Sequence, residues 1–399
     1  MTCETIDILV SGGGVAGLTA AAAFGAAGFS VICVDPMAPV TAEADPGADL
    51  RSTAFLQPSI AVLEKAGLWQ RLAPHAAALQ IMRIIDAGGV DPAPRLIKDF
   101  DASDISDQPF GWNLPNWLLR REILAALQQR PNVDFRPGIA TKALTTRAAE
   151  ALVTLSDGSR ISAKLVIAAD GRNSTLRQAL DIPVKTIRYG QKALVFAVGH
   201  DLPHHNVSTE IHRSGGPFTL VPLQERDGRP ASAVVWMERG PEAARLAALP
   251  EAEFTAAINQ RSCGILGELQ LLSKRALWPI IAQSAAHMAG ERCALLAEAA
   301  HVVPPIGAQG LNMSLADLAA LLDLAEKSPA TLGDEAMLQA YHRARHFDIE
   351  TRLHGIDLLN RASMIEAQPL RDLRAKTLEA LYSFKPLRQK LMRSGLGLK

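Results

Sequence analysis

At 399 residues, the chain is long enough for one large domain or for two domains that share an extensive core. Its 41 basic and 41 acidic residues cancel, so the charge gives no indication of binding to nucleic acid or to an acidic partner. The cysteines are scattered and have neither CxxC pairing nor histidine spacing for zinc, so we expect no metal site and reduced thiols in a cytoplasmic protein. They are Cys3, Cys33, Cys263 and Cys293.

The N-terminus enters an apolar strand within a few residues, which leaves no room for a signal peptide. No uninterrupted apolar run approaches the ~18–20 residues needed to span a bilayer. We therefore expect a soluble protein or one that is peripheral to a membrane.

The first predicted elements are a strand, a glycine turn and a helix, read from residues 7–27, and a second strand over residues 31–35. In such a unit the first glycine permits a tight turn, the second lets the backbone approach a pyrophosphate, and the third lets the helix pack close to the strand. Free N–H groups at the helix start face the phosphates, and an acid after the second strand reaches the ribose hydroxyls. The predicted dinucleotide-binding residues are Gly12, Gly14, Val15, Ala16, Gly17 and Asp35.

The next segment alternates loop, helix and strand. Thr41–Leu50 is rich in Ala, Asp, Pro and Gly and predicts a loop, and Pro58–Leu72 has apolar residues at helical spacing. Arg51, at the end of the loop, has two open interpretations: a solvated surface charge, or a contact to an anion or a flavin. Leu79–Ala87 predicts a strand, and Gly88–Asp107 predicts an exposed polar segment.

A helix that begins at Trp117 carries two adjacent arginines that must point to different faces. We expect one of them in solvent and take Arg121 as the one that reaches cofactor phosphates. After three short strands, an apolar strand over residues 165–169 runs into Asp170-Gly171. This pattern predicts a buried parallel strand with a site at its carboxyl end, and a plain turn is the alternative.

The second half begins with short β segments divided by Gly, Pro and Asp over residues 186–237, which predict an inserted antiparallel sheet beside a substrate pocket. Pro241–Ser273 predicts helix, and Arg292–His301 predicts an apolar strand that ends in an acid. Residues 302–310 form a loop with two prolines and two glycines, followed by a helix over Leu311–Leu324 whose N–H groups can stabilise negative charge. Two amphipathic helices close the chain.

Three of these segments, in this order, resemble the flavin-dependent aromatic hydroxylases of the para-hydroxybenzoate hydroxylase type, and more narrowly their ubiquinone-biosynthesis branch. The resemblance covers nearly the whole chain. Besides the glycine turn and Asp170-Gly171, it is carried by Asp49-Leu50-Arg51, Ala299-Ala300-His301, Pro304-Pro305, Gln309-Gly310-Leu311-Asn312, Asp317 and Leu359-Asn360-Arg361.

The resemblance implies an α/β fold: a Rossmann-like FAD-binding domain with an inserted antiparallel-sheet substrate domain and C-terminal helices. The expected ranges are 1–80, 108–182 and 275–340 for the FAD-binding domain, 81–107 and 183–274 for the substrate domain, and 341–399 for the helical segment. It also implies FAD as cofactor. The implied cofactor contacts outside the glycine turn are Arg51, Arg121, Asp170, Glu298, Gly310, Leu311 and Asn312.

The chain departs from the family at Ala297-Glu298, where Gly-Asp is usual. Glutamate can still accept the hydrogen bond from the flavin ribityl chain, but it is one methylene longer, and Ala297 adds a β-carbon. Loss of such a charged hydrogen bond would weaken FAD binding on the order of ten- to a hundredfold. We interpret the change as a family variant, with a flavin-free descendant as the alternative.

The implied mechanism has no conventional catalytic triad. The resemblance implies that NAD(P)H reduces FAD and that O2 adds at flavin C4a to give a hydroperoxide, which transfers oxygen to an electron-rich ring. The chain has no second glycine fingerprint, so NAD(P)H is expected to bind only transiently. The loop Pro304, Pro305, Ile306 and Gly307 faces the flavin ring, without an assigned acid or base. His301 is expected to be structural and hydrogen-bonded to backbone rather than a catalytic base.

The implied substrate is a phenol with a long prenyl tail, which calls for peripheral contact with the inner membrane or with a quinone-biosynthesis complex. A basic cluster at the C-terminus either touches anionic lipid or is a solvated helix end. Its members are Lys385, Arg388, Lys390, Arg393 and Lys399. Two other functions stay open: hydroxylation of a small soluble aromatic, and a flavin-fold binding or scaffold protein without activity.

Overall fold

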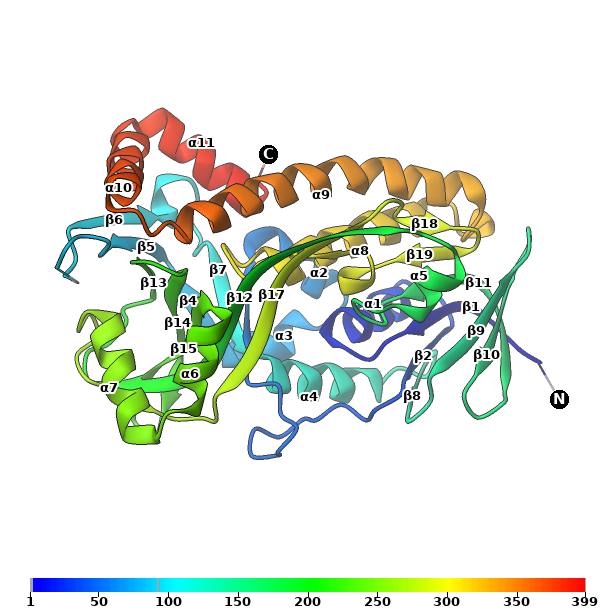
Figure 1. The fold of residues 1–399 in the computed structure, drawn as a ribbon. Coiled ribbons are helices and arrows are strands. Elements are labelled where there is room, and N and C mark those ends of the chain that lie inside the picture. Colours follow the sequence, from blue (N-terminus) through cyan, green and yellow to red (C-terminus); the bar gives the residue numbers. More distant parts are fainter. Residues whose placement is uncertain (1–2, 92, 399) are drawn as a thin grey trace.

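The computed structural model describes residues 3–91 and 93–398 (Figure 1). In this part of the chain, eight strands form a first sheet with the order β18-β19-β11-β1-β2-β8, and β10 and β9 extend it from β11. The strands are β1 (Cys3–Ser11), β2 (Val31–Asp35), β8 (Val133–Pro137), β9 (Thr141–Thr146), β10 (Ala151–Leu155), β11 (Arg160–Ala168), β18 (Ala289–Gly290) and β19 (Cys293–Leu295).

The core of this sheet is parallel, since β1 pairs in parallel with β2 and β11, β2 with β8, and β11 with β19. Ile8, Leu9 and Val10 of β1 are fully buried, which explains the continuous apolar sequence of this strand. Parallel strands bring their carboxyl ends to one edge. The glycine turn, Asp35, Asp170 and the segment after β19 therefore meet at the same edge of the sheet.

A second, larger sheet contains nine strands in the order β20-β17-β12-β15-β14-β13-β5-β6, with β16 paired to β12. Its long strands β12 and β17 cross the molecule between the first sheet and the strands β13–β15 (Figure 1). The strands are β5 (Ile81–Asp86), β6 (Leu96–Asp101), β12 (Val184–His200), β13 (Val207–His212), β14 (Pro217–Arg226), β15 (Arg229–Arg239), β16 (Leu269–Leu271), β17 (Ala276–Ala285) and β20 (His301–Val302).

Two sequence predictions about these strands were wrong in part. The segment 88–107 is not only an exposed excursion, because β6 lies within it and pairs antiparallel with β5. The predicted strand Arg292–His301 is interrupted, because β19 ends at Leu295 and a short 3-10 helix, η3 (Ala297–Ala299), precedes β20.

A third sheet has three strands in the order β3 (Ser52–Leu56), β7 (Gly111–Pro115) and β4 (Ala77–Leu79). The helices up to residue 262 are α1 (Val15–Ala26), α2 (Gln57–Lys65), α3 (Trp69–Leu72), α4 (Asn116–Leu127), α5 (Thr175–Ala179), α6 (Gly240–Ala248) and α7 (Glu251–Ser262).

The C-terminal third is helical: α8 (Gln309–Lys327), α9 (Glu335–Ser363), α10 (Gln368–Ser383) and α11 (Lys385–Leu396). In Figure 1, α9 runs along one side of the molecule, and α10 and α11, drawn in red, lie at its far end beside β5 and β6. The predicted fold class, a Rossmann-like unit with an inserted antiparallel sheet and C-terminal helices, is confirmed. The domain ranges stay a prediction; β17, within 275–340, pairs with β12 of the large sheet.

Candidate active site

The glycine turn after β1 is closely packed on one side and open on the other. Gly12 has a backbone φ of +116°, and a β-carbon there would lie 2.2 Å from the carbonyl oxygen of Ala169. A β-carbon on Gly17 would lie 1.9 Å from the carbonyl oxygen of Gly12, so helix α1 approaches the turn too closely for any side chain. A β-carbon on Gly14 would meet no atom within 4 Å. The open side is where a ligand can approach the backbone.

The start of α1 has the features of an anion site. Gly14 is its N-cap residue and has no side-chain hydrogen bond, and the first intrahelical bond runs from the Leu18 N–H to the Gly14 carbonyl (2.9 Å). The N–H groups of Val15 and Ala16 belong to the first turn of a helix, which has no intrahelical acceptors for them. They are available to a phosphate.

Asp35, at the end of β2, lies against this turn. Its Oδ2 accepts a hydrogen bond from the Gly13 N–H (2.6 Å), and its Oδ1 accepts one from the Met37 N–H (2.8 Å). These bonds fix the carboxylate beside the glycine turn, where sequence predicted a ribose contact. Each oxygen keeps a second lone pair for a ligand hydroxyl.

Asp170 follows β11 and caps a short helix. Its Oδ2 accepts hydrogen bonds from the N–H groups of Thr175 (2.9 Å) and Leu176 (3.3 Å) at the start of α5. Its Oδ1 is buried and has no partner among the described residues. A buried carboxylate oxygen without a donor is costly, so this atom fits a site that a ligand hydroxyl completes.

Arg51 is held by Asp49. The Arg51 Nε and Nη2 groups donate to the two carboxylate oxygens of Asp49 at 2.8 Å each, and Asn116 Nδ2 donates to Asp49 at 3.0 Å. Arg120 Nη2 lies 3.6 Å from the same carboxylate. Burial alone would raise the pKa of Asp49, but the hydrogen bonds and charges of these partners hold it below its ordinary value. Asp49 therefore stays ionised and orients Arg51.

The Arg51 guanidinium lies over the ring of Trp278, with 4.5 Å between its Cζ atom and the ring centroid. Burial lowers the pKa of Arg51, but Asp49 and the negative charge of Glu298 raise it above its ordinary value. Both Trp278 Nε1 and Arg120 Nε are buried donors without an acceptor in the described chain, so this region also has polar atoms that a ligand can satisfy.

Arg121, the predicted phosphate ligand, lies away from this network. Its Nε donates to Glu122 (2.8 Å), its guanidinium lies 5.5 Å from the Trp117 ring, and its side chain is 44% exposed. The structure brings its neighbour Arg120 to Asp49 instead. Sequence reasoning also did not assign Asn116 or Trp278 to the site.

The loop of residues 304–307 connects β20 of the large sheet to helix α8. Ile306 is buried and packs in a cluster with residues of β12, β15 and β17, among them Val195, Met237 and Trp278. The loop ends at Ala308, with a φ of +56°, where α8 begins. Gln309 Nε2 then donates to the carbonyls of Gly307 (2.9 Å) and Gly395 of α11 (3.0 Å).

Asn312 has a structural side chain. Its Oδ1 accepts from the Leu56 N–H (2.8 Å) and from Ser59 Oγ (2.6 Å), and its Nδ2 donates to the carbonyls of Ala54 (2.7 Å) and Ala308 (2.6 Å). The side chain thus ties α8 to β3 and α2. The Asn312 side chain is thus fully used within the protein, whereas the backbone N–H groups of Gly310 and Leu311, in the first turn of α8, have no intrahelical acceptors.

At Ala297-Glu298, where the chain departs from the family, the first residue has an unfavourable backbone conformation. Ala297 has a φ of +57°, in the left-handed region that favours glycine. A β-carbon there costs about 1–2 kcal/mol relative to the right-handed region. Glu298 is exposed in the turn that follows.

His301 is deeply buried in an ion-pair network. Its Nε2 lies 2.6 Å from Asp317 Oδ2, and Arg345 Nε donates to Asp317 Oδ1 at 2.7 Å. The sequence predicted a hydrogen bond to backbone, and this was wrong, because the partner of His301 is the carboxylate of Asp317. His301 joins β20 to α8 and, through Arg345, to α9, which gives it a structural position.

A pocket of about 470 Å³ lies beside Leu50, between the loop before β3 and the turn from β14 to β15. A smaller adjoining pocket shares Glu43, Leu50, Arg226 and Ser273 with it. The smaller pocket is otherwise lined by Ser52, Pro115, Trp117, Ala197, Leu223 and Ala233. The cavity thus leads from a charged mouth to apolar side chains of the large sheet.

Residues 5–352 match the family described as FAD binding domain. The chain belongs to this family. The orphaned Asp170 Oδ1 and the open side at Gly14 fit its cofactor, FAD. The protein is an FAD-dependent aromatic-ring monooxygenase of the para-hydroxybenzoate hydroxylase type.

Two relatives of this FAD-binding protein align over nearly their whole length. It is 30% identical over 397 residues to ubiquinone hydroxylase UbiL of Rhodospirillum rubrum, covering 99% of this chain and 90% of that one. It is 26% identical over 401 residues to 3-demethoxyubiquinol 3-hydroxylase of Escherichia coli, covering 100% of both. The crystal structure of p-nitrophenol 4-monooxygenase PnpA of Pseudomonas putida superposes with a TM-score of 0.80 at 19% identity, covering 99% of each chain, and supports the fold.

Proposed function

We propose that this protein hydroxylates the ring of a prenylated phenol in ubiquinone biosynthesis. When bound, FAD supplies the two-electron chemistry with NAD(P)H and O2, which amino-acid side chains cannot supply. The observation that carries the proposal is the position of the 304–307 loop. Ile306 packs beside Val195, Met237 and Trp278 of the large sheet, so a flavin ring at this loop would lie next to an apolar, aromatic surface that excludes water.

In this proposal, the glycine turn and the first turn of α1 hold the FAD pyrophosphate, and Asp35 holds the adenosine ribose. Asp170 Oδ1 and Glu298 accept from ribityl hydroxyls. Arg120, rather than Arg121, is the helix α4 cation that serves the cofactor, because it lies beside Asp49 and has a buried free donor.

Catalysis in this site needs stabilisation of negative charge more than a proton relay. The N–H groups of Gly310, Leu311 and Asn312 lie in the first turn of α8, directly after the 304–307 loop. Such N–H groups and the positive end of the helix dipole stabilise an anion at the edge of a flavin ring. Pro304 and Pro305 keep the loop rigid, which fixes the distance between ring and helix.

The full-length similarity to two ubiquinone-pathway hydroxylases supports a prenylated substrate. A substrate with such a tail resides in a bilayer, so we also propose that the protein works at the surface of the inner membrane, alone or with other enzymes of quinone biosynthesis.

The test is to incubate the FAD-loaded protein with NADH or NADPH and either a prenylated phenol or the same phenol without its tail. We expect NAD(P)H oxidation stimulated by the prenylated phenol, and a product that gains one oxygen atom by mass spectrometry. Turnover of the plain phenol alone would assign the protein to small aromatics. A protein that takes up no FAD would be a scaffold, and either result would overturn the proposal.

A further inference from the structure

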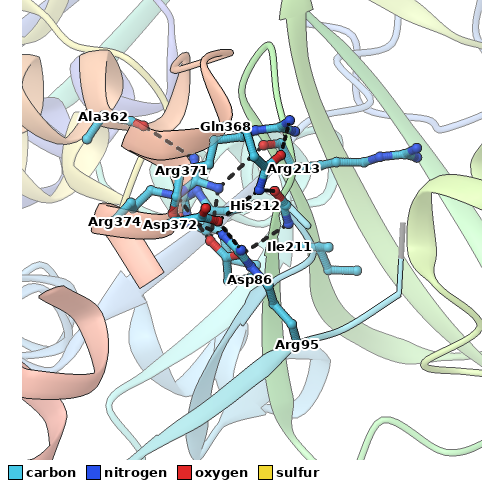
Figure 2. Close-up of polar contacts among 12 residues, drawn as sticks. Asp86, Arg95, Ile211, His212, Arg213, Ala362, Gln368, Arg371, Asp372 and Arg374 are labelled. Carbon is cyan, nitrogen blue, oxygen red and sulfur yellow. Dashed lines mark hydrogen bonds and ion pairs between the residues drawn. The ribbon is translucent and has the colours of Figure 1, made fainter. Parts of the chain in front are cut away.

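Polar and charged groups attach helix α10 to the body of the protein. Asp86, at the end of β5, is 1% exposed and accepts hydrogen bonds from Arg95 Nε (2.5 Å) and from Arg374 Nη2 of α10 (3.0 Å). Arg95 also donates to the carbonyl of Arg371 (3.0 Å) and pairs with Asp372. Figure 2 shows these groups converging on Asp86 from β5, the segment before β6, and α10.

Helix α11 continues the attachment. Arg388 Nη2 donates to Asp104 Oδ2 (3.0 Å), and Gln389 Nε2 donates to the carbonyl of Asp104 (2.7 Å). At the far end of the helix, the carbonyl of Gly395 accepts from Gln309, directly after the 304–307 loop (3.0 Å). The hairpin α10–α11 therefore bridges the edge strands of the large sheet and the proposed flavin-ring loop.

Helix α10 and the residue that follows it also expose large apolar side chains. Leu370, Leu373 and Phe384 are 50%, 59% and 61% exposed, and Leu381 is 37% exposed. At roughly 100° per residue, the three leucines fall within an arc of about 80°, comparable to the stripe that a surface helix normally turns toward the core, and Phe384 directly follows the last residue of α10. The side of α10 against the protein is mixed, because Arg374 donates to Asp86 and the ring of Tyr382 packs against that of Phe100 in β6, with 5.3 Å between the ring centroids. Leu391 of α11 is 45% exposed.

The same two helices also carry exposed cations. Lys376, Lys385, Lys390 and Arg393 are exposed, and within residues 3–91 and 93–398 none of their side chains forms an ion pair. Arg388, which the sequence placed in the same cluster, is instead paired with Asp104, and Lys399 lies outside the described residues. We call Leu370, Leu373, Leu381, Phe384 and Leu391 with these four cations the hairpin face.

The composition of the hairpin face distinguishes a lipid surface from a protein partner. The cores of protein interfaces are depleted in lysine, whereas interfacial helices combine Leu and Phe with Lys and Arg that extend toward anionic head groups. Within the described ranges, no helix is both long and apolar enough to cross a bilayer. A bilayer contact by these helices must then be one that lies on the surface.

We infer that the hairpin face docks on the surface of an anionic bilayer. The inference deepens the proposed function, since a prenylated substrate would be taken from that bilayer. Polar side chains of α10 and α11 hold the hairpin to the β5–β6 region of the large sheet. The end of α11 contacts Gln309, so the hairpin is also connected to the proposed active site.

The test is co-sedimentation of the full-length, FAD-loaded protein with vesicles of phosphatidylglycerol and phosphatidylcholine, and with vesicles of phosphatidylcholine alone. One variant removes apolar contact (L373Q/F384Q), and a second removes the four charges (K376Q/K385Q/K390Q/R393Q). The matched controls change a leucine and a phenylalanine elsewhere (L202Q/F347Q, which are 52% and 79% exposed), or four exposed cations on other elements (K142Q/R160Q/K185Q/K327Q).

We expect the wild type and both controls to bind the anionic vesicles. The apolar variant should lose about tenfold in partitioning, and the charge variant on the order of a hundredfold. Equal binding of hairpin variants and controls, or no binding of the wild type to anionic vesicles, would overturn the inference.

The same variants are assayed for turnover of a prenylated phenol in detergent micelles, which need no bilayer contact. Full turnover with lost vesicle binding supports the hairpin face. If neither the wild type nor any variant turns over the phenol, but the wild type still binds anionic vesicles, the result counts against the proposed function and not against the membrane contact. Selective binding of a protein of quinone biosynthesis to the hairpin face, with no binding to vesicles, would replace the bilayer by that protein.

Discussion

His301 Nε2 and Asp317 Oδ2 lie 2.6 Å apart, and both side chains are almost completely buried. The second oxygen of Asp317 is occupied by Arg345, so the carboxylate links β20, α8 and α9. A histidine fixed in this way joins β20 and α8, the two elements that flank the 304–307 loop, and its side chain is shielded from solvent.

Replacement of His301 tests this structural role. His301→Gln leaves a buried carboxylate with one partner fewer, so we expect the free energy of unfolding to fall by about 3 kcal/mol. The pH dependence of kcat should be unchanged, because the ring takes no proton from the substrate. The exposed His205→Gln is the control, and a pH–rate profile that loses a limb only in the His301 variant would make His301 a catalytic base.

The adjacent arginines of α4 form a matched pair. Arg120 lies beside Asp49 and has a buried free Nε, whereas Arg121 is paired with Glu122 at the surface. We expect Arg120→Gln to raise the Kd for FAD about tenfold and Arg121→Gln to change it less than twofold. Titration of the apoprotein with FAD, followed by flavin fluorescence, measures both. The opposite order of effects would restore Arg121 as the cofactor contact.

Ala297 offers a stabilising substitution. Its φ of +57° is unfavourable for a residue with a β-carbon, so Ala297→Gly should raise the free energy of unfolding by about 1 kcal/mol. The double variant A297G/E298D restores the usual family pair and should also bind FAD more tightly. Thermal unfolding and FAD titration follow the two effects, and a lower melting temperature for Ala297→Gly would show that the β-carbon contributes packing.

The attachment of α10 should depend on pH through Asp86. Burial alone would raise the pKa of this carboxyl, but Arg95, Arg374 and the Gly88 N–H hold it below its ordinary value of 3.8. A lowered pKa in the folded state means that the carboxylate stabilises the fold above 3.8, and that this stabilisation is lost as the pH falls through the folded value.

We therefore expect the backbone amides of residues 368–383 to exchange slowly at pH 5. Below about pH 4 they should exchange faster than the pH dependence of unprotected amides alone would predict. Asp86→Asn should give fast exchange at both pH values. Protection of α10 in that variant would show that other contacts hold the helix.

Local patterns account for the part of the site that sequence predicted. The glycine turn, the acid after β2 and the Asp-Gly pair after β11 follow strands whose parallel pairing brings their ends together, and the proline loop precedes the predicted helix, which begins at Gln309, two residues before the predicted start. These features depend on near neighbours in the chain. They fix the edge of the sheet where the site lies.

The missed features depend on contacts between distant segments. Arg120 and Arg121 differ by about 100° on one helix, and the orientation of α4 against Asp49 decides between them. Trp278 reaches Arg51 only through the pairing of β17 with β12. The sequence of β6 lacks the alternation typical of a half-buried strand, and its packing partner is α10, far along the chain, where the Tyr382 ring contacts that of Phe100.

In the proposed reaction, the protein inserts one atom of O2 into a prenylated ring with FAD as its cofactor. The direct measurement is the mass of the product formed by the FAD-loaded protein from a prenylated phenol and NAD(P)H under 18O2. We expect a ring hydroxyl that carries one 18O atom, and no product without FAD. A product whose new oxygen comes from water, or formation of the product by the flavin-free protein, would contradict it.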